Sequence, residues 1–358
     1  MNSKQNILVH GPSDLSVPWA QRIVSHHAAD ARVSDVQLQS VDVGTTTRFR
    51  VVVEHDAPDR LPTRWFVKVP STTLKSRVVT GLPRFMHKEV RFYRDVSHSV
   101  PVKLAPSLAA QSRFGRGATL VLSDVTEFGG VPGNPSDALS FRQASQVVEH
   151  LAQFHAQFWN KPALVHRHRW LSGSVSAEDV LGTVMAVPLM KRGLSLAGDL
   201  VPAGFHAPAL RYARRRREVM RRLALGPKTL VHHDCHPGNL FWTSQGQPGL
   251  LDWQLVRMGE GMGDVAYFLA TSLEPECRRA HEEALLDLYL CALERHGVAE
   301  LDEVQARLRY RAHLAYPFEA MLLTLAIGGL MDLDSNLGLI RRATAAVTDH
   351  DAFGALAI

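Results

Sequence analysis

Apolar and polar residues alternate through much of the first third of the chain, whereas apolar residues recur at helical spacing in most of the remainder. Residues 36–69 contain three alternating runs, which are separated by the polar segment 44–47 and by a proline-containing turn at 58–62. Alternation with a period of two predicts strands with one buried face, and the short connections predict an antiparallel meander. Two further runs, 105–111 and 118–122, predict two more strands.

Apolar residues recur every three or four positions in several longer segments, which predicts amphipathic helices. The clearest case is 139–159, where Val147 and Leu151 belong to one apolar face. The predicted helices are 16–29, 75–96, 139–159, 265–273, 275–296, 301–325 and 338–347. Segment 161–208 is irregular and rich in glycine and proline. Strands early in the chain and helices later predict an α+β fold.

The stretch 230–264 carries the densest group of reactive side chains. Two apolar runs, 230–231 and 250–251, each lead directly into polar residues, and residues 244–249 between them have turn composition. We expect a catalytic loop, a hairpin of short strands and a second acidic loop. The hairpin would fold Asp252 back beside Asp234 and Asn239.

These three side chains suit phosphoryl transfer. The Asp234 carboxylate can accept a proton from an attacking hydroxyl, while the Asn239 amide oxygen and the Asp252 carboxylate are hard ligands suited to Mg²⁺. Asn239 follows Asp234 by five residues (239 − 234 = 5). This is the step from aspartate to asparagine in kinase catalytic loops.

The segment from His232 to Asn239, with Leu-Asp-Trp at 251–253, resembles the aminoglycoside phosphotransferase and choline kinase family. The resemblance implies a protein-kinase-like two-lobe fold, with a small antiparallel-sheet N-lobe (1–122) and a larger, mainly helical C-lobe (123–358). It implies that ATP and Mg²⁺ lie between the lobes and that a small-molecule hydroxyl is phosphorylated. Asp234 would then be the catalytic base and His232 a brace for the loop, with Asn239 and Asp252 as magnesium ligands.

The resemblance has one departure and one further match. His233 stands where the family usually has glycine, which requires either an unstrained backbone or a histidine at an unusual φ. Asp264 looks like the family's aspartate that caps the next helix. Capping is also the ordinary reason for an aspartate at a helix start.

Lys68 lies late in an otherwise apolar strand, where a charged side chain is unexpected. One interpretation is a lysine whose ammonium reaches solvent from the strand end. The resemblance instead pairs Lys68 with Glu89, 21 residues on (89 − 68 = 21), so that the lysine is oriented toward the nucleotide phosphates.

Two other segments match the family by position. Gly44, Thr45 and Thr46 fall where a kinase phosphate-binding loop lies, between the first two strands. Backbone N–H groups and threonine hydroxyls there could hold phosphate oxygens. The strand end with Leu122 and Asp124 resembles the hinge, whose backbone groups face the adenine.

Composition fits a soluble globular enzyme, with 46% hydrophobic and 21% charged residues. No apolar run approaches the length of about 20 residues that a membrane span needs. We also expect no signal peptide, because the N-terminus lacks an apolar core. The three cysteines are an odd set without metal-ligand spacing, which indicates reduced thiols and a cytoplasmic protein.

The arginine-rich run 211–222 has two interpretations, a nucleic-acid or anionic-membrane patch and a solvated helix face. Aromatic residues for base stacking are almost absent around it, so the solvated face is favoured and no nucleic-acid partner is expected.

The acceptor is the part of the reaction that the motifs do not specify. Residues 316–325 form an apolar run with aromatic residues, and Glu319 is one acid within it. A polyamine sugar would call for clustered carboxylates, so this composition points to a mainly apolar acceptor with a hydroxyl. Core packing explains most of these residues equally well. Two rival functions are a non-catalytic nucleotide sensor on the same fold and, less favoured, a protein kinase.

Overall fold

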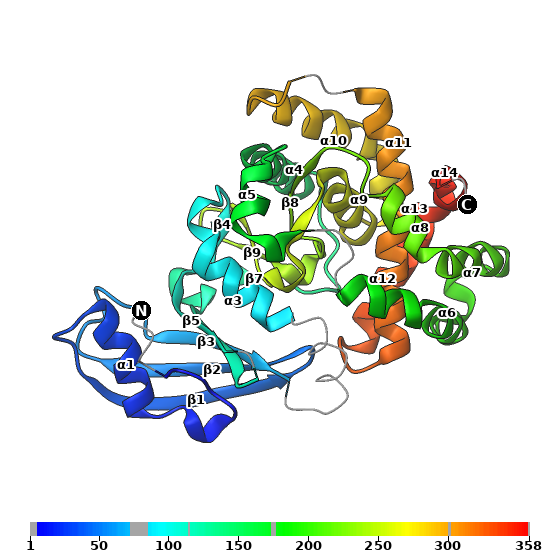
Figure 1. Cartoon of the computed structure of the whole chain (residues 1–358). Helices are drawn as coiled ribbons and strands as arrows, with labels where there is room; N and C mark the ends of the chain where they lie inside the picture. Colours follow the sequence, from blue (N-terminus) through cyan, green and yellow to red (C-terminus); the bar gives the residue numbers. More distant parts are fainter. Residues whose placement is uncertain (1–5, 72–84, 114, 173–176, 300–301, 357–358) are drawn as a thin grey trace. The chain divides into compact units, whose positions relative to one another are not determined.

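The computed structural model describes residues 6–71, 85–113, 115–172, 177–299 and 302–356 (Figure 1). The chain divides into two units. Unit 1 comprises Met1–Pro132 and Phe241–Gln254, and unit 2 comprises Gly133–Leu240 and Leu255–Ile358. The sequence led us to expect a division after residue 122. Residues 241–254, which include Asp252, belong to unit 1 together with the N-terminal segment.

An antiparallel five-stranded sheet is the framework of unit 1, which confirms the predicted meander. Its order is β1-β2-β3-β6-β5. The strands are β1 (Val33–Val43), β2 (Thr46–His55), β3 (Arg64–Pro70), β5 (Ser107–Arg113) and β6 (Gly117–Ser123). Valines and aromatic residues dominate the inward positions of β2 and β3, where branched and aromatic side chains pack well on a pleated surface.

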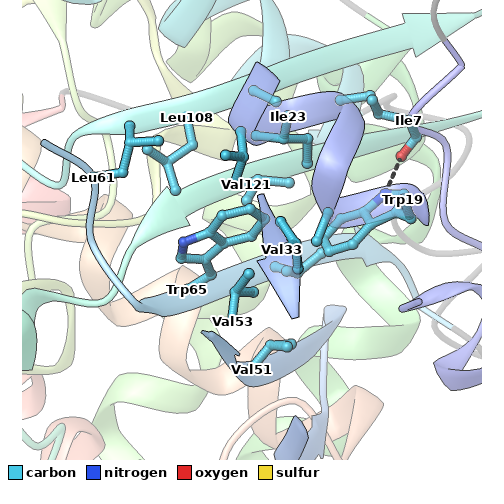
Figure 2. Close-up of a cluster of buried hydrophobic side chains, with 14 of the residues drawn as sticks. Ile7, Trp19, Ile23, Val33, Val51, Val53, Leu61, Trp65, Leu108 and Val121 are labelled. Carbon is cyan, nitrogen blue, oxygen red and sulfur yellow. Dashed lines mark hydrogen bonds between the residues drawn. The ribbon is translucent and has the colours of Figure 1, made fainter. Parts of the chain in front are cut away.

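One face of this sheet is covered by α1 (Val17–His27), as Figure 1 shows for the helix beside β1–β3. Trp19 and Trp65 meet edge to face with ring centroids 5.8 Å apart, and the Trp19 indole N–H donates to the Ile7 carbonyl at 3.1 Å. Figure 2 labels the apolar side chains around them: Ile7, Trp19, Ile23, Val33, Val51, Val53, Leu61, Trp65, Leu108 and Val121. The indole hydrogen bond leaves no buried donor unsatisfied at this point.

The opposite face of the sheet carries the polar residues. Successive side chains of a strand point to opposite faces, so Lys68 points away from the cluster that contains Val67 and Val69. The strand register pairs Lys68 with Leu120, and Phe66 with Leu122. The helix α3 (Phe85–Asp95) supplies Glu89 to this face. Residues 75–84 of the predicted helix 75–96 lie outside the described residues.

A second, four-stranded sheet completes unit 1 in the order β4-β10-β9-β7. Its strands are short: β4 (Lys103–Leu104), β7 (Val131–Pro132), β9 (Leu240–Trp242) and β10 (Pro248–Leu250). Gly249 of β10 faces the Phe241 ring, which an added Cβ would approach to 2.2 Å, so this position has room only for glycine. Asp252 follows the β9–β10 hairpin by two residues.

Unit 2 is mainly helical and is built around α9 (Gly261–Ser272), eleven of whose residues are buried. A helix surrounded by protein is apolar on all sides. Around it pack α4 (Phe141–Phe158), α10 (Pro275–Arg295), α11 (Glu303–His313), α12 (Ala315–Ile327) and α13 (Leu333–His350). The strands β8 (Lys228–Val231) and β11 (Arg257–Glu260) form an antiparallel pair. The remaining described helices of four or more residues are α5 (Pro162–Arg167), α6 (Ala177–Ala197), α7 (His206–Arg214), α8 (Arg216–Arg222) and α14 (Ala352–Ala355).

Two predicted helical segments need correction. The predicted helix 301–325 is two helices, because Pro317 has no N–H to donate to His313 and its ring would clash there in a continuous helix. The predicted helix 338–347 begins earlier, where Asp332 accepts a hydrogen bond from the Ser335 N–H as the N-cap.

The arginine run 211–222 is also only partly the solvated face that we expected. Most of its arginines are exposed or partly exposed, but Arg216 is buried and its Nε donates to Glu319 at 2.6 Å. Among the described residues, no helix is both long and apolar enough to cross a membrane.

Candidate active site

A buried cluster of three charged groups occupies the polar face of unit 1. The Lys68 ammonium lies 2.8 Å from Glu89 Oε1 and 3.0 Å from Asp252 Oδ1. Lys68 is 3% exposed and Glu89 is fully buried. Lys68 is therefore paired inside the protein rather than solvated at a strand end, and it joins two of the other candidate site residues.

The pKa values in this cluster follow from burial and from an excess of negative charge. Burial alone would lower the pKa of Lys68, but the Asp252 and Glu89 carboxylates outweigh it and raise the pKa above its usual value. Burial raises the pKa of Glu89 to about 7; Asp252 adds to this rise and Lys68 opposes it. Two carboxylates thus share one ammonium.

The turn that carries Asp252 is held against α3. Asp252 has a left-handed backbone (φ 58°), which aspartate tolerates better than most residues. The next residue, Trp253, stacks on Phe92 with ring centroids 4.1 Å apart and donates its N–H to Glu89 Oε1 at 3.3 Å. Glu89 therefore contacts both the lysine and the aspartate turn.

The predicted phosphate loop is a tight turn between β1 and β2. The Gly44 N–H donates to the Thr46 carbonyl at 2.9 Å, and the Gly44 carbonyl accepts from the Ser71 hydroxyl at 3.1 Å. Thr45 is partly exposed, whereas Thr46 is buried and its hydroxyl has no hydrogen-bond partner among the described residues. Strand alternation puts Thr46 on the same face of the sheet as Lys68.

The two hinge candidates differ in how their polar groups are used. Leu122 is buried in β6 on the Lys68 face of the sheet. The Asp124 carboxylate accepts from the Thr126 N–H and hydroxyl and from Arg50, and its N–H donates to the Arg64 carbonyl. Capping and ion pairing explain the Asp124 side chain, and its part in nucleotide binding stays a prediction.

In unit 2 the catalytic loop is fastened to α9 by Asp264. Its two carboxylate oxygens accept the N–H groups of His232 and His233, both at 2.7 Å. Asp264 lies within the first turn of α9, whose N-cap is Glu260, so its expected role as a helix cap is wrong. Hydrogen bonds from two successive N–H groups fix the loop immediately before Asp234.

His233 adopts φ 71°, the second of the two alternatives that its replacement of glycine left open. A left-handed backbone is uncommon for residues other than glycine, and such strain persists only where surrounding contacts hold it. The hydrogen bond to Asp264 is one such contact. Another is the stacking of the His233 ring on Tyr316, at a centroid distance of 4.3 Å.

A buried histidine extends this bracing. His155 of α4 lies with Nε2 3.2 Å from Asp264 Oδ2 and Nδ1 2.8 Å from the Tyr289 hydroxyl. A carboxylate only accepts, so the network assigns the proton to Nε2. Gly261 must be glycine here, because an added Cβ would lie 2.6 Å from the Tyr289 hydroxyl. His155 is a buried core histidine that holds Asp264, and Asp264 holds the loop.

The Asp234 carboxylate is itself held on both oxygens. The Tyr267 hydroxyl donates to Oδ1 at 2.7 Å, and the Asn239 amide donates to Oδ2 at 3.0 Å and to the Asp234 carbonyl at 2.9 Å. Burial and the nearby Asp234 charge raise the pKa of Tyr267 well above its usual value, so its hydroxyl stays a donor. Sequence patterns did not identify Tyr267, which lies on a mostly apolar, buried helix.

His236 is the other side chain near Asp234 Oδ1, with Nε2 at 4.0 Å. Its Nδ1 accepts the Gly238 N–H at 3.1 Å, which directs the proton of a neutral ring to Nε2. The ring therefore presents a donor toward the carboxylate.

Asn239 in unit 2 and Asp252 in unit 1 each carry an oxygen of the kind that Mg²⁺ binds. Both amide hydrogens of Asn239 are used within the loop, which leaves its carbonyl oxygen as the atom that can bind a metal. Asp252 belongs to the cluster in which negative charge exceeds positive charge. Among the described residues no group of three or more His, Cys, Asp or Glu could hold a metal. Mg²⁺ does not need one, because it commonly binds one or two carboxylates together with phosphate oxygens and water.

A family model described as a phosphotransferase enzyme family matches residues 40–301, which is more than half of the chain. The chain belongs to this family. This membership confirms the enzyme class that the catalytic loop indicated, a phosphotransferase of the kinase type. No curated protein matches the sequence.

Solved structures with the same fold have very different sequences. The GDP complex of wild-type aminoglycoside 2'-phosphotransferase-IIIa is 12% identical, with a TM-score of 0.54 over 92% of this phosphotransferase and 98% of that chain. A choline kinase from Cryptosporidium parvum is 11% identical, with a TM-score of 0.54 over 94% of each chain. An ethanolamine kinase from Plasmodium vivax is 12% identical, with a TM-score of 0.50 over 96% and 90%. These similarities confirm the kinase-like α+β fold.

Proposed function

We propose that this phosphotransferase moves the γ-phosphoryl group of ATP to a hydroxyl of a small molecule. The observation that carries the proposal is the Asp234 carboxylate, which is partly exposed and fixed on both oxygens, in a loop that Asp264 braces. A carboxylate held in this way is ready to accept a proton from a bound hydroxyl.

The proposed roles follow from the contacts in each unit. Asp234 orients the acceptor hydroxyl and takes its proton as the new O–P bond forms and the bond to the β-phosphate breaks, with ADP as the leaving group. Lys68 binds the α- and β-phosphates, and Glu89 holds Lys68 in place. His232 fixes the loop through its N–H bond to Asp264.

The remaining roles concern the nucleotide and the metal. Asn239 and Asp252 would hold magnesium, which when bound neutralises charge on the phosphates. We propose that Gly44, Thr45 and Thr46 approach the phosphates. Leu122 is apolar and lies on the Lys68 face of the sheet, which suits a contact with the adenine ring. Asp124 would contribute a backbone group at the hinge.

The test is ADP release from Mg-ATP across aminoglycosides, macrolides, choline, sugars and apolar alcohols. Asp234→Asn keeps the shape of the side chain but removes its ability to accept the proton, so we expect acceptor-dependent turnover to fall about 10²–10⁴-fold with nucleotide affinity nearly unchanged. Asp199→Asn, at an exposed position of unit 2, is the matched control and should retain wild-type turnover.

Three outcomes would count against the proposal in different ways. Full phosphotransfer by Asp234→Asn would exclude Asp234 as the base. Mg-ATP binding without ADP release on any acceptor would favour the nucleotide sensor. Phosphorylation of generic protein substrates in place of small molecules would favour a protein kinase.

A further inference from the structure

His233, Tyr267 and Tyr316 form a group of ring side chains in unit 2, and Tyr267 contacts the Asp234 carboxylate. Tyr316 of α12 stacks on His233 at an interplanar angle of 21°, and its ring lies 5.9 Å from the Tyr267 ring. Tyr267 donates its hydroxyl to Asp234. His233, Asp234 and Tyr316 are each partly exposed, whereas Tyr267 is buried. The His233–Tyr316 stack therefore lies beside the proposed base and reaches the surface of the unit.

The backbone at His233 makes this stack a specific feature of the chain. Glycine would adopt φ 71° without strain, yet this position carries a ring that pays a conformational penalty. Residues held in sparsely populated backbone regions cluster at active sites and ligand-binding sites. Two of the contacts that hold His233 are the Asp264 hydrogen bond and the Tyr316 ring.

The acidic residue nearest to this stack along α12 is already neutralised. Glu319 is 1% exposed, and its two oxygens accept from Arg216 Nε at 2.6 Å and from the Tyr212 hydroxyl at 2.8 Å. It is therefore not a partner for a charged amine on an acceptor.

Positive charge also lies close to the stack. Burial and the Asp234 carboxylate raise the pKa of Tyr316, while the Arg257 and Arg216 guanidinium groups act in the opposite direction. An acceptor with several ammonium groups would meet the partly exposed Arg257 guanidinium, whereas Arg216 is buried against Glu319. Like charges at short range raise the free energy of such a complex.

We propose that His233 and Tyr316 form the acceptor-binding surface and that it takes the flat, uncharged, apolar body of an alcohol whose hydroxyl reaches Asp234. This inference rests on the proposed function, because Asp234 is taken as the base. Aromatic rings bind flat apolar groups through dispersion and the loss of hydrated surface, which requires no charge on the ligand.

Calorimetric titration of the full chain tests this surface without turnover. The probes are 2-(2-naphthyl)ethanol as a flat neutral alcohol, choline as a compact cation and kanamycin as a polycation. Choline is included because an aromatic face can also bind a quaternary ammonium. We expect the naphthyl alcohol to bind the wild type more tightly than either cation.

Two variants remove the surface in different ways. Tyr316→Ala removes one ring, and His233→Gly removes the other while relieving the backbone strain. We expect each to weaken binding of the naphthyl alcohol at least tenfold while the affinity for Mg-ATP stays within twofold. If Tyr316→Ala unfolds, His233→Gly still carries the test, because glycine favours the backbone conformation required there.

The matched control is Phe141→Ala, which disrupts another aromatic–histidine stack of unit 2, at an exposed position. Phe141 stacks on His281 with ring centroids 4.5 Å apart, and neither residue belongs to the proposed site. Binding of the naphthyl alcohol should be unchanged in this variant. An equal loss in Phe141→Ala and in the site variants would overturn the assignment of the surface.

The remaining outcomes separate this inference from the proposed function. Tighter binding of choline or kanamycin than of the naphthyl alcohol, or no binding of that alcohol, overturns the aromatic surface. ADP release stimulated by kanamycin would at the same time support phosphotransfer. Binding of the naphthyl alcohol that depends on both rings, without ADP release on any acceptor, supports the surface and overturns phosphotransfer.

Discussion

The two units hold their functional carboxylates by different means. In unit 1, Glu89 and Asp252 share the single ammonium of Lys68 within 3.0 Å. In unit 2, Asp264 and Asp234 accept hydrogen bonds from backbone N–H groups, the His155 ring, an amide and a tyrosine hydroxyl. One arrangement depends on a full buried charge, and the other depends on the geometry of several hydrogen bonds.

This difference determines how each arrangement should fail. Removal of one member of a buried ion pair leaves the partner charged and without compensation, which is strongly destabilising. Removal of one neutral donor leaves the other hydrogen bonds to the carboxylate in place, so the loss is smaller. Variants of the two units therefore separate effects on folding from effects on the catalytic group.

The largest effect is expected for Lys68→Met. This change leaves the buried Glu89 carboxylate and the partly exposed Asp252 carboxylate without their shared cation, so we expect the free energy of unfolding to fall by about 3–5 kcal/mol. Urea unfolding of the full chain, followed by circular dichroism, measures this loss. Binding of Mg-ATP to the folded fraction should fall as well.

Lys103→Met is the control for Lys68→Met, because Lys103 also belongs to a strand of unit 1 but is exposed. We expect a change within about 0.5 kcal/mol, as for most surface substitutions. Equal losses in the two variants would mean that the buried pairing of Lys68 contributes nothing special to stability.

The sequence predicted the unit 1 pair because one residue broke a clear pattern. A lysine in an apolar strand needs a partner, and resemblance placed Glu89 at the right distance along the chain. The strands and most helices were predicted for the same reason, since their patterns are local. Glu319 and Arg216 were not paired in advance, because they come from helices more than 100 residues apart.

The bracing in unit 2 was harder to predict because it depends on contacts that no local pattern encodes. Asp264 was expected to cap a helix, since aspartate near a helix start has this role in most proteins. Its partners, the His232 and His233 N–H groups, precede it by about thirty residues. The role of Tyr267 was not predicted for a related reason. On a helix that is buried on all sides, a tyrosine has the pattern of an ordinary core residue.

A smaller effect on stability and a clear effect on turnover are expected for Tyr267→Phe. The variant loses one hydrogen bond to a charged group, a loss of about 1.5–3 kcal/mol. If Tyr267 positions Asp234, kcat should fall at least tenfold, equivalent to about 1.4 kcal/mol, with KM for ATP unchanged. Steady-state ADP release on the best acceptor measures both constants.

Tyr310→Phe is the matched control for this variant. Tyr310 is equally buried in unit 2, and its hydroxyl donates to the Glu282 carboxylate at 3.1 Å. It should lose stability without losing kcat. A parallel fall of kcat in both variants would reduce Tyr267 to a structural residue.

The smallest effect is a pH dependence of stability in unit 2. There one carboxylate, Glu260, has two basic partners, whereas in the unit 1 cluster two carboxylates share one lysine. Burial would raise the pKa of Glu260, but hydrogen bonds and charge from His313 and Arg309 lower it below its usual value of 4.5. A carboxyl whose pKa is lowered by folding contributes stability above its unfolded pKa and loses that contribution as the pH falls through the folded pKa. Glu260→Gln should therefore be less stable than the wild type at neutral pH, and the two should converge as the pH falls below 4.5 and through the lowered pKa of Glu260. Urea midpoints at several pH values measure this convergence, and a constant difference across the range would contradict the assigned origin of the stability.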